Sequence, residues 1–463
     1  DDGDDEEFKS ETDEALERNR SKLWSTTRRE YDYANIPIID HNNYILDYKM
    51  LNSMVEKDYK LKHEKYDYYM KYDDIVAIQK RAFKQFLNES KNIVSYMVKE
   101  FELRKNADQM KRVSISKTGH LNMSRIYSYK FSEDIFRKAA IVPDGKSHGL
   151  VMFIDWSGSM SEYLHDTIKQ MLNLVMFCKK VNIPYEVYSF TTEGFIKDIP
   201  PKANDIEMGS FGLFNLLSSR MTASEFSKTA GMLLTIYRPW HRRHEDDSIV
   251  HADVLQLGGT PLNEAIVSAM TIVPEFRKKY NLQIVNTIFL TDGEGQASNL
   301  IYRGNDGSQR RYEYNSTLVL RDPVTREEAI VEFEDTKSYT QAFLKLLKAR
   351  VGGNIVGFHI SSQRDAKYML GSNPTIQIPS KPGLDRDSVI NSIVASLRKD
   401  RYAILNCSGY DEYYLLRSDA LDTASEEFTL QDNSTVKSIA KKYTKYASMK
   451  RTNRIILNRF IGM

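Results

Sequence analysis

Residues 153–160 read FIDWSGSM, and this stretch decides how the fold is interpreted. The apolar run GLVMFI at 149–154 ends at Asp155. Ser157 and Ser159 follow at alternate positions. A short, continuous apolar run is typical of a strand that is buried on both faces of a parallel sheet. In such sheets, ligands bind beyond the carboxyl ends of the strands. A carboxylate and two hydroxyls at that end therefore predict a cup for a hard cation.

The sequence after this stretch alternates between further apolar runs and helical patterns. Buried strands are expected at 184–190, 283–290, 354–360 and 402–406, and helices at 165–181, near 222–238 and at 261–276. Strands that alternate with helices in this way are typical of parallel sheets with helices on both faces. We therefore expect an α/β fold with a doubly wound, mostly parallel, Rossmann-like sheet.

The part of the chain before the apolar run has a different composition. Residues 1–16 carry a dense acidic run with little to bury, which predicts a disordered tail or linker. Residues 17–147 are expected to be mainly helical, because apolar residues recur at helical spacings between Asp74 and Arg112. This stripe fits one long helix or two helices broken near Asn88. The stretch that follows it is punctuated by Gly, Ser and Asp, which favours short elements.

The α/β domain itself is expected at residues 148–410, with two long excursions. Residues 191–255 form one insertion and contain a helical segment, and residues 301–342 form the other. The second insertion is predicted to be a β-hairpin built around RDPVTREE at 321–328. Residues 411–463 are expected to form a C-terminal extension that packs on the domain.

Composition limits the class of protein. The 463 residues predict two or three domains, and 41% hydrophobic with 28% charged residues is typical of a globular protein. A formal net charge of +2 gives no overall field towards nucleic acid or an anionic membrane, so neither is an expected partner. No apolar run is long enough to span a bilayer, and the acidic start does not resemble a signal peptide. Two cysteines far apart in the chain, Cys178 and Cys407, fit a reducing, cytoplasmic setting.

Two further segments supply oxygen ligands at the same end of the predicted sheet. LGGTPLNEA places Thr260 in a Gly-rich loop before a helix, and FLTDGEG places Asp292 at the end of a strand. With Asp155, Ser157 and Ser159, these residues supply two carboxylates and three hydroxyls. Hard oxygen ligands of this kind suit Mg²⁺ or Mn²⁺, and the set lacks the soft ligands that select zinc.

DWSGSM, GGTPL and TDGEG, in that order and on those elements, resemble a von Willebrand factor A (VWA) domain. In that family, D-x-S-x-S with a later Thr and Asp forms the metal-ion-dependent adhesion site (MIDAS). The resemblance implies that the ligands here are Asp155, Ser157, Ser159, Thr260 and Asp292. The stretch DGKSHGLVMFIDWSGSM and the upstream IFRK also resemble the von Willebrand subunit of aerobic cobaltochelatase and its relatives from large tailed phages. This resemblance covers residues 118–300 well and 354–410 loosely.

The resemblance implies a coupling role rather than catalysis by this chain alone. The ion keeps one coordination position open for a partner carboxylate, and the usual partner is a ring of a MoxR-type AAA+ ATPase. The sequence has no G-x-x-x-x-G-K-[ST] loop, so ATP hydrolysis is assigned to the partner. Two alternatives stay open. One is a cobaltochelatase-like subunit that inserts metal into a tetrapyrrole, and the other is a structural or adhesion protein, phage-encoded for example, without an ATPase.

Other residue groups fit competing functions less well. Three histidines lie close together in the sequence: His241, His244 and His251. Two neighbouring arginines would repel a cation, so a solvated loop or a partner contact is favoured over zinc. Ser157 lacks the G-x-S-x-G elbow of a nucleophile. Trp156 either contacts a partner or is buried under a loop. The Tyr- and Lys-rich stretch 58–72 also contains acidic residues, which favours an amphipathic helix over nucleic-acid binding.

Overall fold

The computed structural model describes residues 30–40, 44–65, 70–112, 114–121, 123, 130–131, 136–141, 147–196, 198, 202–236, 252–293, 301–303, 309–311, 316–331, 337–372, 376–377 and 385–417. The acidic segment 1–16, the histidines at 241–251 and everything after residue 417 lie outside these ranges. The predictions made for those three segments are therefore not addressed by the structure.

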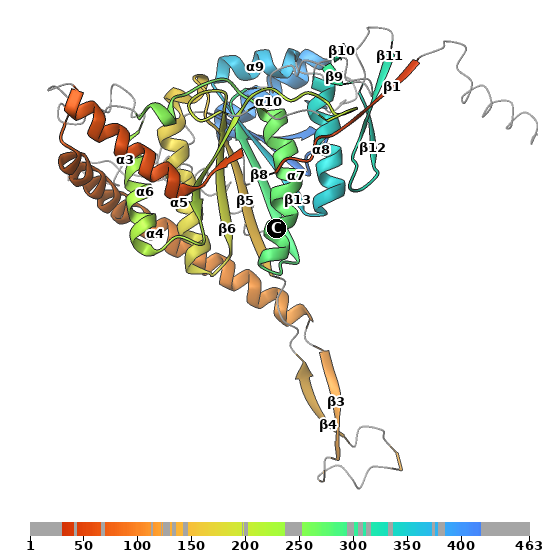
Figure 1. The fold of residues 1–463 in the computed structure, drawn as a ribbon. Coiled ribbons are helices and arrows are strands. Elements are labelled where there is room, and N and C mark those ends of the chain that lie inside the picture. The colour runs from red at the N-terminus through yellow and green to blue at the C-terminus, as the bar shows by residue number, and fades with distance from the viewer. Residues whose placement is uncertain are drawn as a thin grey trace, which may run out of the picture.

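A mixed sheet of nine strands forms the centre of the molecule (Figure 1). Its strand order is β14-β15-β16-β13-β8-β5-β6-β7-β2. From one edge to the other, the strands are Ile376–Gln377, Tyr402–Cys407, Glu412–Arg417, Asn354–Ser361, Ile284–Thr291, His148–Asp155, Tyr185–Thr191, Gly212–Ser218 and Ile45–Leu46. The five strands from β16 to β6 run parallel, whereas β7 is antiparallel to β6 and β15 is antiparallel to β16. The expected mostly parallel α/β sheet is present, and its arrangement is compatible with a Rossmann-like fold.

The order of the strands reverses between β5 and β8. Moving from β5 towards one edge, the chain adds β6 and β7, and towards the other edge it adds β8, β13 and β16. Doubly wound sheets bind ligands at this reversal, because the connections leave the two strands in opposite directions and open a crevice. Strand β5 is buried from Gly149 to Asp155, in keeping with its position at the middle of the sheet.

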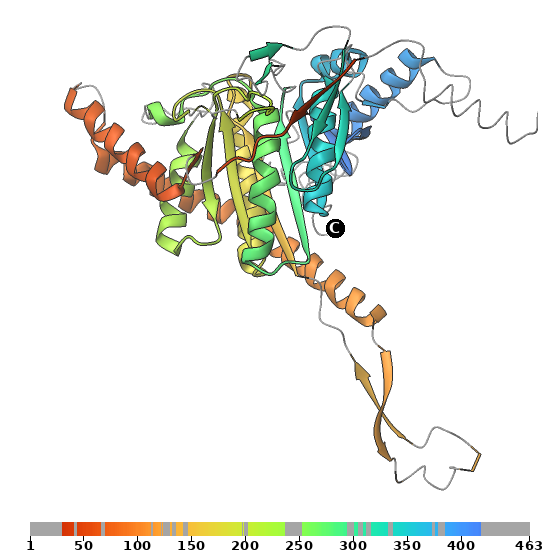
Figure 2. The same ribbon diagram turned by 45° about the vertical axis from the view of Figure 1, so that its right-hand side comes forward.

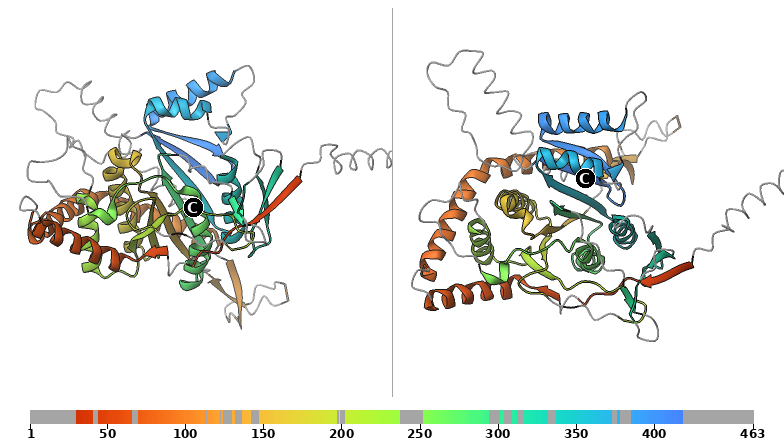
Figure 3. Two further views of the ribbon diagram at one scale, coloured as in Figure 1. Left: turned by 45° about the horizontal axis from the view of Figure 1, so that its top comes forward. Right: turned by 90° about the horizontal axis from the view of Figure 1, so that it is seen from above.

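Helices cover both faces of the sheet (Figure 3). Helices α5 (Leu164–Lys180) and α6 (Ala223–Thr235) pack with Leu150, Met152 and Ile154 of β5 in one apolar cluster. Helices α7 (Leu262–Lys279) and α8 (Lys337–Val351) pack with Val151 and Phe153 in a second cluster. Alternate residues of β5 therefore pack into the apolar clusters on opposite faces of the sheet, which explains why this strand is apolar throughout.

The N-terminal region adds helices and strands to this α/β unit. Helix α3 (Tyr48–Lys65) and helix α4 (Tyr72–Arg112) contribute buried residues to the same cluster as α5 and α6. Of the two arrangements expected for the apolar stripe, the single long helix is the one found. Beyond α4, strands β3 (Ser114–Leu121) and β4 (Phe136–Ile141) form a two-stranded hairpin that projects away from the sheet (Figure 2). These strands were not expected from the sequence.

The predicted hairpin near residues 321–328 is confirmed. Strands β11 (Ser316–Arg321) and β12 (Glu328–Val331) are antiparallel, and β1 (Glu30–Asn35) pairs in parallel with β11. The short strands β9 (Ile301–Arg303) and β10 (Gln309–Arg311) form a separate antiparallel pair. The buried carboxylate of Asp322 at the hairpin turn is bonded by the guanidinium of Arg350, which fastens the hairpin to α8.

Three sequence expectations about this domain differ from the structure. Residues 191–255 are not simply an insertion, because they contain β7 of the central sheet and α6 of its cover. The strand predicted at 402–406 is present but is not fully buried: Ile404 is 57% exposed, because one face of β15 near the sheet edge meets solvent. The domain boundary at residue 410 is too early, because β16 pairs with β13 inside the sheet.

The remaining helices belong to this last part of the chain. Helices α9 (Gln363–Ser372) and α10 (Arg386–Asp400) pack with β15 and β16 in a third, smaller apolar cluster. Across the described ranges, every helix is either too short or too polar to cross a bilayer.

Candidate metal centre

The five predicted ligands meet at the carboxyl ends of β5 and β8. Asp155 is the last residue of β5, and Asp292 follows the last residue of β8. Ser159 opens the short 3-10 helix η2 (Ser159–Glu162), and Thr260 stands two residues before α7. The reversal of strand order thus places residues from three distant segments at one crevice.

Hydrogen bonds connect the members of this cluster. The Ser159 hydroxyl donates to Asp292 Oδ1 at 2.8 Å, and the hydroxyl oxygens of Ser157 and Ser159 are 3.0 Å apart. Thr260 lies beside the turn after β8. A Cβ built on Gly293 in that turn would be 3.6 Å from the hydroxyl oxygen of Thr260. The serine loop, the threonine loop and the end of β8 therefore form one polar site.

Asp155 carries a buried oxygen without a conventional hydrogen bond. The side chain is 0% exposed, its Oδ2 accepts from the Thr291 hydroxyl at 2.7 Å, and its Oδ1 has no hydrogen bond of ordinary length and angle. Burial raises the pKa of this carboxyl to about 7, although the Thr291, Ser157 and Thr260 hydroxyls lower it. A buried carboxylate that is this poorly hydrogen-bonded is costly unless a cation compensates its charge.

The second carboxylate, Asp292, also has a raised pKa. Burial raises the pKa of Asp292 above its ordinary value, against the lowering effect of the Ser159 hydrogen bond. The charge of Asp292 also raises the pKa of Asp155. Two carboxylates that repel each other in a partly dry crevice would gain stability from a divalent cation placed between them.

Backbone contacts set the distance between the serine and threonine loops. Gly158 N donates to Gly258 O at 2.9 Å, and Gly258 N donates to Trp156 O at 3.2 Å, so the loops pair like two short strands. A Cβ on Gly258 would lie 2.7 Å from Thr191 Oγ1 and 2.8 Å from the backbone nitrogen of Glu193. Only glycine allows this close approach of backbone to the end of β6.

Two residues that support the site were not singled out by the sequence analysis for this role. Thr291, the last residue of β8, bonds Asp155 across the sheet. Its position directly before Asp292 was the available signal. Trp156 is 0% exposed and donates its ring Nε1–H to Leu255 O at 3.0 Å, so the buried alternative for this residue is the one found.

The donor set fits magnesium better than a soft metal. The described part of the chain contains no group of three or more His, Cys, Asp or Glu side chains suited to a metal ion. The crevice offers two carboxylates and three hydroxyls, and an ion with only two charged ligands fills its remaining positions with neutral oxygens or water. Such sites suit Mg²⁺, which retains several waters in proteins.

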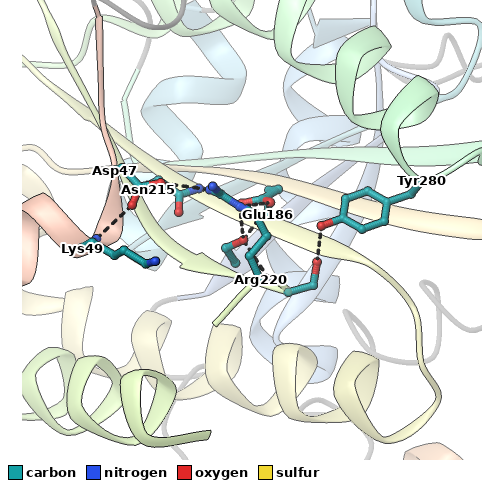
Figure 4. A network of polar contacts seen from close by, with 8 residues as sticks. Asp47, Lys49, Glu186, Asn215, Arg220 and Tyr280 are labelled. Atoms are coloured by element: carbon teal, nitrogen blue, oxygen red, sulfur yellow. Dashed lines mark hydrogen bonds and ion pairs between the residues drawn. The ribbon is translucent and has the colours of Figure 1, made fainter. Parts of the chain in front are cut away.

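A second polar network lies around Glu186, near the start of β6 (Figure 4). The buried carboxylate of Glu186, near the start of β6, accepts from Asn215 Nδ2 and from the Ser218 hydroxyl, both at 2.8 Å. Arg220 lies 3.4 Å from Glu186 and bonds Asp47 at 3.1 Å, immediately before α3. Burial raises the pKa of Glu186. This network attaches the start of α3 to the edge of the sheet.

No protein-family model and no curated protein matches the sequence. Among solved structures, the pilus adhesin SpaC from Lactobacillus rhamnosus GG is similar at 12% sequence identity and a TM-score of 0.30. The match covers 66% of this chain and 31% of the adhesin, so the chain spans less than a third of that protein. A similarity at this TM-score carries no argument about fold or function.

Proposed function

We propose that this chain binds Mg²⁺ through Asp155, Ser157, Ser159, Thr260 and Asp292, and that the bound ion holds a carboxylate of a partner protein. The observation that carries the proposal is the buried Oδ1 of Asp155, which lacks a conventional donor. A cation would offset the charge of this oxygen and that of Asp292. Mn²⁺ has the same preference for oxygen ligands and is the expected substitute.

Each residue of the site has a distinct part in this proposal. Asp155 and Asp292 supply the negative charge, and the Thr291 hydrogen bond orients the first of them. Ser157, Ser159 and Thr260 supply neutral oxygens, so they add no negative charge that would repel an incoming carboxylate. When bound, the ion would offer a coordination position to an incoming carboxylate. Attraction in a partly dry crevice is directional, so it can select a partner or a conformation.

We further propose that the chain is a VWA-family coupling module that works with a MoxR-type AAA+ ATPase. The D-x-S-x-S, Thr and Asp elements and their place at the switch between β5 and β8 support the VWA assignment. The ATPase would supply the energy, because the sequence has no phosphate-binding loop of the G-x-x-x-x-G-K-[ST] kind. In this role, the chain converts ring motion into an effect on a target without performing bond-breaking chemistry.

Calorimetric titration with MgCl₂ and with MnCl₂ tests the metal site. We expect one bound ion for the wild type and none for Asp155→Asn, which keeps the shape of the side chain. Absence of binding in the wild type would overturn the proposal.

Capture of partners from host lysate, in Mg²⁺ and in EDTA, tests the coupling role. Recovery of an AAA+ ATPase with Mg²⁺ alone, and its loss in Asp155→Asn, is the expected result. Recovery of tetrapyrrole-synthesis enzymes would favour the chelatase-like role. Recovery of the same partners in EDTA would refute capture through the ion.

A further inference from the structure

Helix α3 reaches the metal centre through a continuous set of contacts. It lies in the N-terminal region, yet it bonds the segment that leads to Thr260. We propose that Asp58 and Lys62 of α3 are positioning residues for the metal site: they hold residues 252–260 and thereby set the affinity for the ion. This inference rests on the proposed function, because it assumes that the site binds metal.

The first contact joins α3 to the 3-10 helix η4 (Asp253–Leu255). Asp58 Oδ2 accepts from the backbone nitrogen of Asp253 at 3.0 Å, so it caps the exposed start of η4. The ammonium of Lys62 lies 2.6 Å from Asp253 and 2.8 Å from Asp58, and only 15% of its side chain is exposed. One lysine therefore bridges two carboxylates that lie on different segments.

Apolar packing reinforces this contact. Val55 and Tyr59, on the buried face of α3, belong to the same apolar cluster as Val254 and Leu255 of η4. Trp156 belongs to that cluster as well. The polar contact of Lys62 lies at the rim of a packed interface, where it fixes the register of η4 on α3 rather than providing the whole attachment.

The second contact joins η4 to the ligands. Leu255 O accepts from the ring nitrogen of Trp156 at 3.0 Å, and Trp156 stands between Asp155 and Ser157 in the chain. Gly258, three residues further on, exchanges backbone hydrogen bonds with the serine loop. A shift of η4 on α3 would therefore move Thr260 relative to Asp155 and Ser157.

Loss of the Lys62 charge has a defined consequence. Without it, the carboxylates of Asp58 and Asp253 face each other without a shared cation, and their repulsion shifts η4 on α3 while the apolar packing keeps the two together. Residues that orient metal ligands from outside the coordination shell change metal affinity when they are replaced. Lys62 acts through two intermediate segments, so we expect a loss of roughly three- to tenfold for Lys62→Gln.

The test is calorimetric titration of the full chain with MnCl₂ and with MgCl₂. Lys60→Gln is the matched control, because Lys60 is on the same helix and its ion pair is with Glu56 of α3 itself. We expect weaker metal binding in Lys62→Gln, wild-type affinity in Lys60→Gln, and recovery towards wild type in Lys62→Arg. A melting temperature measured in EDTA reports fold stability separately.

The outcomes that contradict the inference differ from the one that contradicts the proposed function. If the wild type binds Mn²⁺ and Lys62→Gln binds it equally well, α3 does not position the site, and the proposed function survives. The same conclusion holds if Lys62→Gln lowers only the melting temperature in EDTA. If the wild type itself binds neither ion, the proposed function fails first.

A double-mutant cycle checks that the two contacts belong to one path. Trp156→Phe keeps the ring in the core and removes the hydrogen bond to Leu255 O. When two changes interrupt the same path, their effects on affinity add to less than the sum of the single effects. Fully additive losses in the Lys62→Gln, Trp156→Phe double variant would refute transmission from Lys62 through Trp156.

Discussion

Replacing Asp155 with asparagine should stabilise the metal-free protein at alkaline pH. Burial raises the pKa of this carboxyl from 3.8 to about 7, which corresponds to at most about 4 kcal/mol against folding once the group is ionised. The buried amide retains a desolvation cost of about 1–2 kcal/mol. The expected net gain is therefore about 2 kcal/mol at pH 8, or about 2–4 °C in melting temperature for a chain of this size.

The raised pKa of Asp155 makes the stability of the metal-free protein depend on pH. A carboxyl whose pKa is higher in the folded state binds protons more tightly when folded, so stability falls as the pH rises from about 4 to about 7. The gain from Asp155→Asn should be absent at pH 5, where Asp155 is protonated, and complete at pH 8. The assay is thermal unfolding in EDTA across this range, with the exposed Asp400 replaced by Asn as the control.

In Mg²⁺, the wild type should become more stable than Asp155→Asn, the reverse of their order in EDTA. A ligand that binds only the folded state stabilises it, so Mg²⁺ should raise the melting temperature of the wild type and leave Asp155→Asn unchanged. A variant that is less stable than the wild type at pH 8 in EDTA, or that gains equally at pH 5 and pH 8, would refute the reasoning. Either result would mean that the buried charge of Asp155 does not destabilise the metal-free protein.

Three further predictions concern the supports of the site. Thr291→Val removes the donor to Asp155, so it should raise the pKa of that carboxyl further and shift the pH needed for Mn²⁺ binding upwards in calorimetry. Gly258→Ala should abolish metal binding, because its Cβ would lie under 3 Å from atoms at the end of β6; retained affinity would contradict this geometry. Arg350→Met leaves the buried carboxylate of Asp322 without its cation and should cost about 3–5 kcal/mol, seen as a melting temperature lowered in EDTA and Mg²⁺ alike.

The sequence by itself determined several strands and helices of the α/β unit and the residue types at the candidate site. Apolar runs and helical spacing are local properties, so the strand at 149–154 and the helix at 165–181 were recognisable from a few neighbouring residues. The oxygen-bearing residues at the ends of these elements were recognisable for the same reason. Burial of β5 on both faces also follows from its uninterrupted apolar sequence.

The tertiary structure alone decided which distant segments meet. Pairing of β5 with β8 brings Asp292 to the end of β5, 137 positions after Asp155 in the chain. The partial exposure of β15 depends on its place near a sheet edge, and the path from α3 to Thr260 depends on packing between segments almost 200 residues apart. Such contacts arise from the fit of whole elements, which no local periodicity records. The physical reason is that burial and side-chain pairing depend on the neighbours each element acquires in the folded chain.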